Sequence, residues 1–162
     1  MATAHPDEER LTLSTRFGEG HDLTAACHEY LKAVNEELFE RFHPSNAIRP
    51  LLVARADAVD LVLRKLWDNH VGNPDNVLLA AVGGYGRGEL FPHSDVDILF
   101  LLGESVDEEV EAGIAEMLRA LWDLGLKVGQ SVRTLSECAQ LAANDLTIFT
   151  TMLEARPLSG DK

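Results

Sequence analysis

The 162-residue chain is long enough for one domain with an extension, and its 46% hydrophobic and 25% charged residues are ordinary globular usage. Its 27 acidic and 14 basic residues give a net charge of −13, and such a surface repels nucleic acid, whose binding rests mainly on cation–phosphate contacts. An acidic protein of this kind accepts a small anionic ligand only where a metal ion or a few arginines reverse the local field.

Residues 1–22 mix proline, glycine and charges without periodicity, which predicts a flexible lead. The segment has no apolar stretch typical of a signal peptide, and no apolar run in the chain is long enough to span a membrane. The two cysteines, Cys27 and Cys138, form no metal or disulfide pattern, so helix packing is their simplest interpretation. Together these features predict a cytoplasmic protein without a membrane partner.

Residues 23–72 are predicted to form a helical N-terminal region. From Thr24 to Phe42 the apolar residues recur every three or four positions, as they do on one face of an amphipathic helix. His43-Pro44-Ser45 breaks this pattern, and Ser45 is expected to cap a second helix over about Ala47–Asn69. A turn beginning at Gly72 ends this helical region, and the candidate catalytic and binding residues are expected after it.

Residues 73–162 are predicted to form the catalytic core, an α/β (α+β) fold in which helices flank a small mixed sheet. Two mainly apolar runs favour strands, at Val77–Val82 and Asp95–Leu102, and Leu126–Arg133 is a third strand candidate. The first and second of these runs are separated by a glycine-rich segment, which is where the candidate chemistry lies.

Capping signals place helices around the third predicted strand. Ser105 with Glu108 is expected to form a capping box for a helix that Gly125 closes. Thr134 with Glu137 is expected to form a second box, after which one or two helices run nearly to the end of the chain.

Two aspartates begin the second predicted strand. Because side chains alternate along a strand, Asp95 and Asp97 are expected to point to one face while Val96 points into the core. Two carboxylates on one face repel each other unless a cation lies between them, and Mg²⁺ prefers hard oxygen ligands. The pattern therefore predicts a magnesium site on Asp95 and Asp97.

A glycine-rich turn, Gly83-Gly84-Tyr85-Gly86-Arg87-Gly88, directly follows the first predicted strand. A triphosphate needs backbone N–H donors with no side chains in the way, and Gly83 and Gly84 leave that approach open. The segment Tyr85–Leu90 is a candidate for a helix whose N-terminus faces the phosphates. Arg87 is well placed to contact them as well, so the turn predicts a nucleotide site.

Several residues near these motifs have two interpretations each. Ser94 either donates to a phosphate or satisfies the backbone of the turn before the aspartates. Glu89 either orients the neighbouring arginine through an ion pair or is a solvated charge. Arg133 either reaches the triphosphate or pairs with a carboxylate. Trp67 and Trp122 lie on helical stripes, which favours a place in the core over a role as nucleobase platforms.

The ordered set of strand, Gly-Gly turn and Asp-Val-Asp resembles the signature of the DNA polymerase β-like nucleotidyltransferase superfamily. More particularly, the string from Gly83 to Asp97 is similar to that of the bifunctional uridylyltransferase/uridylyl-removing enzymes, which modify the nitrogen-regulatory protein PII. The likeness continues in four further segments, Leu121–Gly129, Ser131–Thr134, Asp145–Thr147 and Leu153–Arg156.

This resemblance implies transfer of UMP from UTP to a tyrosine of PII, with release of pyrophosphate, in nitrogen-status signalling. It implies that the two aspartates hold one or two Mg²⁺ ions and serve as the catalytic residues. It also implies a nucleotide-binding set made of Gly83, Gly84, Arg87 and Ser94.

The sequence departs from the superfamily pattern in one respect. Members commonly carry a third carboxylate on a later strand, but the third predicted strand contains no Asp or Glu. Asp145, Glu154 and Glu89 are the candidates, and the sequence does not choose among them.

The family's enzymes continue into a metal-dependent hydrolase domain and into small-molecule-sensing domains. The chain is therefore expected to be a fragment that lacks the uridylyl-removing activity. Two other functions stay open, namely AMP transfer by another enzyme of the superfamily and a non-catalytic regulatory domain that binds nucleotide.

Overall fold

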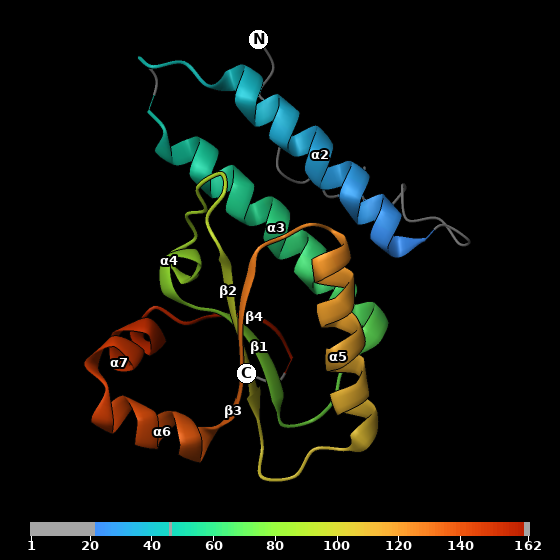
Figure 1. The fold of residues 1–162 in the computed structure, drawn as a ribbon, viewed down its shortest axis with the longest axis vertical. Coiled ribbons are helices and arrows are strands. Elements are labelled where there is room, and N and C mark those ends of the chain that lie inside the picture. The colour runs from blue at the N-terminus through green and yellow to red at the C-terminus, as the bar shows by residue number, and fades with distance from the viewer. Residues whose placement is uncertain (1–21, 46, 161–162) are drawn as a thin grey trace.

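The computed structural model describes residues 22–45 and 47–160, so nearly all of the predicted lead at 1–22 lies outside the described residues. Within the described part, six helices and a four-stranded mixed sheet form an α/β fold (Figure 1). This arrangement confirms the predicted fold class of a small mixed sheet flanked by helices. In the same part of the chain, no helix is long and apolar enough to cross a membrane.

The elements follow the order that the sequence predicts, with one addition. The helices are α2 (Leu23–Arg41), α3 (Arg49–His70), α4 (Gly83–Gly86), α5 (Glu108–Asp123), α6 (Leu135–Asn144) and α7 (Leu146–Leu153). The strands are β1 (Val77–Ala81), β2 (Val96–Leu102), β3 (Val128–Thr134) and β4 (Arg156–Gly160). The sequence pattern does not predict β4, because Pro157 and Gly160 are atypical of strands and are tolerated here at a sheet edge.

The sheet has the strand order β3-β2-β1-β4. Strand β1 is antiparallel to both β2 and β4, whereas β2 and β3 are parallel. A parallel pair needs a crossover connection, and α5 supplies it between β2 and β3. This register sets Asp97 of β2 directly beside Gly129 of β3.

The main hydrophobic core lies on one face of the sheet, under α3 and α5 (Figure 1). Val96, Ile98 and Phe100 of β2 contribute to this core, as expected for alternate residues of one strand. Trp67 of α3 is fully buried, and its ring stacks on Phe100 with the ring centroids 6.4 Å apart. The predicted core position of Trp67 is therefore confirmed.

The opposite side of the sheet carries the short helices α4, α6 and α7 (Figure 1). There Cys138 of α6 packs with Val82 and Leu99 in a small cluster, and Cys27 is buried in the main core. The helix-packing interpretation of both cysteines is thus confirmed. Because Leu99 and Asp97 are two residues apart on β2, Asp97 also turns toward the side of the short helices.

The capping predictions succeed at one helix and fail at two. At α6, Thr134 Oγ1 accepts from the backbone N–H of Glu137 at 3.2 Å, and the Glu137 carboxylate accepts from the Thr134 N–H at 2.8 Å. At α3, however, Ser45 contacts His43 at 2.6 Å, and the helix begins after Ile48 without a side-chain cap. The Ser45 hydroxyl is thus engaged by His43 within the loop before α3 and does not cap the helix.

At α5 the predicted Ser105 box is also wrong, because the N-cap residue is Asp107 and no side-chain cap is formed. The other end agrees with the prediction, since Gly125 has a φ of +71° and its N–H donates to the Trp122 carbonyl at 2.9 Å. Trp122 itself is 55% exposed, so its predicted core position is wrong. The buried stripe runs through Leu121, and Trp122 lies a further 100° around the helix, at the edge of that stripe.

Candidate active site

Asp97 is the second residue of β2, and Asp95 lies one residue before the strand begins, so the predicted strand start is off by one. Asp95 is exposed and Asp97 is half-buried. Burial, and then the negative charge of Asp95, raise the pKa of Asp97 above the usual value for an aspartate. The two carboxylates are thus near enough for one to disfavour ionisation of the other.

Two glycines flank the carboxylate of Asp97, one from the glycine turn and one from the neighbouring strand. A Cβ atom at Gly83 would lie 3.3 Å from Oδ2 of Asp97, and a Cβ atom at Gly129 would collide with Oδ1. The carboxylate therefore lies in a space that exists because these two positions carry no side chain. This contact also brings the glycine turn against the start of β2.

No partner for either aspartate side chain is found among residues 22–45 and 47–160, neither a hydrogen bond nor an ion pair. In the same residues, no group of three or more His, Cys, Asp or Glu side chains gathers as metal ligands do. Two carboxylates without a cationic neighbour fit Mg²⁺, which commonly takes one or two carboxylates and completes its shell with water and phosphate oxygens.

The glycine turn forms α4, a single helical turn that starts at Gly83. Gly83 has a φ of +57°, a left-handed conformation that a residue with a side chain adopts only under strain. The helix predicted over Tyr85–Leu90 is misplaced, because the helical turn ends at Gly86 and Gly88 then adopts a φ of +74°. The N–H groups of Gly83 and Gly84 lie in the first turn, where a helix offers them no carbonyl partner of its own.

Arg87 follows the turn and lies across it. Its Nη1 donates to both carboxylate oxygens of Glu154, at 2.8 and 2.9 Å. A Cβ atom at Gly84 would lie 3.5 Å from Nη2 of Arg87, so the guanidinium lies close to the glycine backbone. The Arg87 side chain is more than half exposed, which leaves it accessible to a ligand at the turn.

The structure gives the contacts of two neighbouring residues that have two interpretations each. Ser94 donates its hydroxyl hydrogen to the Phe91 carbonyl at 2.9 Å, which is the backbone interpretation. Glu89 pairs with Nε of Arg49 at 2.7 Å and not with Arg87, so its proposed orienting role is wrong. Glu89 thus ties the end of the turn to the start of α3.

The three candidates for a third carboxylate each have another partner. Besides the pairs of Glu89 and Glu154 with arginines, Asp145 caps α7 by accepting from the N–H groups of Thr147 and Ile148, at 2.8 and 3.3 Å. Arg133 pairs with Leu101 in the register of β3 and β2, and no carboxylate partner for it is found among the described residues.

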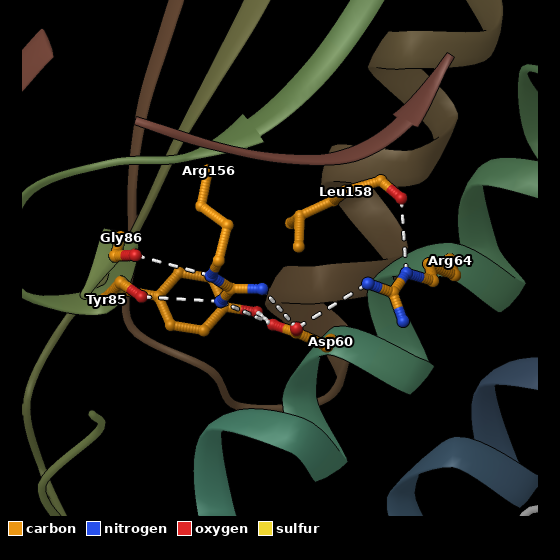
Figure 2. A network of polar contacts seen from close by, with 6 residues as sticks. All are labelled: Asp60, Arg64, Tyr85, Gly86, Arg156 and Leu158. Carbon is orange, nitrogen blue, oxygen red and sulfur yellow. Dashed lines mark hydrogen bonds and ion pairs between the residues drawn. The ribbon is translucent and has the colours of Figure 1, made fainter. Parts of the chain in front are cut away.

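Sequence reasoning missed a buried polar network that holds the glycine turn from behind (Figure 2). Asp60 of α3 is only 4% exposed. Its carboxylate accepts a hydrogen bond from the Tyr85 hydroxyl at 2.5 Å and two from Arg156, at 2.5 and 3.0 Å. Nη2 of Arg64 lies 3.8 Å from Oδ2 of Asp60, and Nε of Arg64 donates to the Leu158 carbonyl at 3.1 Å.

The charges in this network are compensated within the chain. Hydrogen bonds to Asp60 raise the pKa of Arg156, and burial followed by the charge of Asp60 raises the pKa of the Tyr85 hydroxyl far above its usual value. Both groups therefore stay protonated at neutral pH. One sequence signal was available, because Asp60 interrupts an apolar stripe of α3, and a buried acid needs a partner.

An apolar groove of about 520 Å³ lies between α2, α3 and the segment before Asp95. Its lining includes Phe39, Leu52 and Leu90, and among its described lining residues Arg55 is the one with a permanent charge. None of the predicted site residues lines it. The groove is thus separate from the two aspartates and the glycine turn.

Residues 62–156 match the family described as "Nucleotidyltransferase domain". The chain belongs to this nucleotidyltransferase family. The matched segment of the nucleotidyltransferase domain runs from within α3 to the first residue of β4. It therefore contains the glycine turn, both aspartates and Arg156.

The nucleotidyltransferase domain is also similar to curated proteins named bifunctional uridylyltransferase/uridylyl-removing enzyme. It is 47% identical to that of Pseudomonas putida over 137 residues, which cover 84% of this chain and 15% of the relative. The corresponding protein of Ralstonia nicotianae is 47% identical over 134 residues, covering 83% of the chain and 15% of the relative. The protein of Methylococcus capsulatus is 44% identical over 140 residues, which cover 86% of this chain and 16% of the relative.

These matches confirm the family resemblance that the motifs indicate. They cover most of this domain and are not confined to the motif around Asp97. The chain spans only about 15% of the length of the curated relatives it matches.

Proposed function

We propose that this domain transfers UMP from UTP to a tyrosine hydroxyl of the PII signalling protein, in nitrogen-status signalling. The observation that carries the proposal is the contact between the glycine turn and the aspartate pair, where a Cβ atom at Gly83 would lie 3.3 Å from Oδ2 of Asp97. Groups suited to phosphate and groups suited to a divalent cation therefore meet at one place. The name of the relatives favours uridylyl transfer over other nucleotides.

Each part of the site has a role in this proposal. The backbone N–H groups of Gly83 and Gly84 bind the phosphates, and Arg87 adds a positive charge beside them. Ser94 lies next to Asp95, and its hydroxyl, which donates to the Phe91 carbonyl, would turn from that carbonyl to donate to a phosphate. Asp95 and Asp97 hold Mg²⁺, which when bound neutralises phosphate charge and aligns the reacting groups.

The reaction is a displacement at the α-phosphorus of UTP. The acceptor oxygen forms a bond to that phosphorus while the bond to the bridging oxygen breaks, and pyrophosphate leaves with the electron pair. The proton of the acceptor hydroxyl is released. The chain's own contribution is to hold the triphosphate against the turn and to keep the two carboxylates beside its α-phosphate.

The test is to incubate the domain with PII, Mg²⁺ and each labelled nucleoside triphosphate in turn, and to score label on PII. Label from UTP is expected with the wild-type chain and is expected to disappear in Asp97→Asn. The full-length Pseudomonas putida enzyme serves as the positive control for the PII preparation. If that control labels PII while this chain labels nothing from any nucleotide, the proposed activity is wrong for this chain.

One observation favours a second candidate, a regulatory domain that binds nucleotide without transferring it. No third carboxylate joins Asp95 and Asp97 within the part of the chain that the structure describes. In that case UTP binds to the domain but labels no acceptor. Label from ATP instead of UTP would indicate the other alternative, AMP transfer.

A further inference from the structure

We propose that Asp60, Tyr85 and Arg156 are positioning residues that fix the phosphate-binding shape of the glycine turn. The inference rests on the proposed function, because it assumes that this turn binds the triphosphate. The three residues come from α3, α4 and β4, and Figure 2 shows their side chains converging behind the turn. They touch neither aspartate of the candidate metal site.

Tyr85 ties the turn to α3. It is a residue of the turn itself, it is 1% exposed, and its hydroxyl donates to Asp60 at 2.5 Å. Because Asp60 is buried and charged, moving its carboxylate away from these donors is costly. The position of the Tyr85 side chain is therefore fixed by an anchor outside the turn.

Arg156 holds the backbone of the turn. Its Nε donates to the Gly86 carbonyl at 3.3 Å, its Nη2 lies 3.5 Å from the Tyr85 carbonyl, and its guanidinium carbon is 5.6 Å from the centre of the Tyr85 ring. In a helical turn, carbonyl groups point toward the C-terminus and N–H groups toward the N-terminus. Arg156 thus binds the carbonyl side and leaves the N–H groups of Gly83 and Gly84 for a ligand.

The residues just before Arg156 also contact the glycine turn. A Cβ atom at Gly86 would collide with the carbonyl oxygen of Glu154, so the turn packs directly on the backbone that leads into β4. Glu154 also holds Arg87 by two hydrogen bonds. Residues 154–156 therefore set both the backbone of the turn and the place of its arginine.

Arg64 provides a matched control within the network. It contacts the Asp60 carboxylate and the Leu158 carbonyl (Figure 2), and within the described residues it forms no hydrogen bond or ion pair with the glycine turn. Replacing Arg64 by lysine disturbs the network near Asp60 and leaves the contacts of Tyr85 and Arg156 with the turn in place. A purely structural role predicts similar effects of Arg64→Lys and Arg156→Lys, whereas a positioning role does not.

The first readout is the affinity of the whole 162-residue chain for UTP and for UMP, both with Mg²⁺. In Tyr85→Phe and Arg156→Lys, we expect UTP to bind about tenfold more weakly, because misplaced N–H groups lose hydrogen bonds to charged phosphate oxygens. UMP affinity is expected to change less than about twofold, since UMP lacks the β- and γ-phosphates. Arg64→Lys is expected to change neither, whereas a loss of folded protein would lower both affinities together.

The second readout needs no ligand. Hydrogen exchange at the amides of Gly86 and Gly88, which donate to the carbonyls of Val82 and Tyr85 at 2.9 and 3.0 Å, reports on the turn directly. Exchange is expected to accelerate in Tyr85→Phe and Arg156→Lys and to stay unchanged in Arg64→Lys.

The outcomes separate this inference from the proposed function. If the wild-type chain binds UTP while Tyr85→Phe and Arg156→Lys bind it equally well and exchange at the same rates, the positioning role is wrong and the proposed function stands. If the wild-type chain binds no UTP, the proposed function fails and the inference fails with it.

Discussion

Asp60 and the pair Asp95–Asp97 are carboxylates that the same fold surrounds in opposite ways. Asp60 is 4% exposed and accepts hydrogen bonds from a tyrosine and an arginine, with a second arginine beside it. Asp97 is half-buried next to another acid, and its side chain has no partner among residues 22–45 and 47–160. Burial and the charge of Asp95 raise its pKa, so folding works against its ionised form.

The difference separates a structural role from a ligand-binding role. A buried charge with its partners supplied by the chain fixes the relative positions of α3, the glycine turn and β4. An acid pair that has no cationic partner among the described residues costs stability and is typical of a site where a ligand brings the positive charge. Substitutions on the two sides should therefore have different effects: those at Asp60 should lower stability as well as UTP affinity, whereas those at Asp97 should lower transfer and leave stability intact.

The largest effect is expected from Asp97→Asn, and a similar one from Asp95→Asn. Transfer should fall by about a thousandfold or more, because the ligand set for the cation and its charge balance are lost. Thermal stability of the ligand-free chain should stay the same or rise, because a charge disfavoured by its neighbour is removed. Transfer assays with calorimetric melting check both; near-normal transfer in Asp97→Asn would refute the two-carboxylate site.

Asp60→Ala should act on stability. It leaves Arg156 and Tyr85 without their buried partner, so the free energy of unfolding should fall by about 3–5 kcal/mol. Urea unfolding measures the change, and Asp68→Ala, an exposed acid on the same helix, should stay within about 0.5 kcal/mol. Equal small changes in both variants would show that the buried network does not stabilise the fold.

The contrast also shows how far the sequence leads. Period-two alternation is local, so the opposite sides of Val96 and Asp97 on β2 could be predicted, and a continuous apolar run was enough to place β1 and β2. The capping box at α6 was equally local. A helix start without a side-chain cap, as at α3, leaves no capping residue to recognise in the sequence. The start of α3 was therefore predicted wrongly, from Ser45.

Contacts between distant residues could not be predicted in this way. Asp60 meets Tyr85 and Arg156 across 25 and 96 residues, and only the pairing of β4 with β1 brings Arg156 to the turn. In the sequence, Gly129 has no feature that distinguishes it from other strand glycines. Only the parallel register of β2 and β3 shows that it lies beside Asp97. The individual motifs could therefore be predicted from the sequence, whereas the residues that position them could not.

Gly129→Ala tests the space around Asp97 without removing its charge. The new Cβ atom would collide with Oδ1 of Asp97, so the carboxylate must move. Transfer should fall by about tenfold to a hundredfold, because small displacements at a reacting site are costly. Ser131→Ala, two residues along on the same strand, is the control and should stay within about twofold of wild type; equal activity of both variants would contradict the tight fit.

The smallest effect is expected from Glu154→Ala, which removes the ion pair with Arg87. Both side chains are at least one-third exposed, so the pair is screened by water and its loss should cost about 1 kcal/mol or less. Urea unfolding checks this value. A loss comparable with that of Asp60→Ala would mean that the exposed pair contributes as much to stability as the buried network does.

The most direct test of the contrast is a calorimetric titration of the ligand-free chain with UTP, carried out with Mg²⁺ and with EDTA. The wild-type chain is expected to bind UTP in Mg²⁺, and its affinity is expected to weaken by at least about tenfold both in EDTA and in Asp97→Asn with Mg²⁺. UTP affinity that is the same with Mg²⁺ and EDTA, and the same in wild type and Asp97→Asn, would contradict the claim that this aspartate pair awaits a cation brought with the nucleotide.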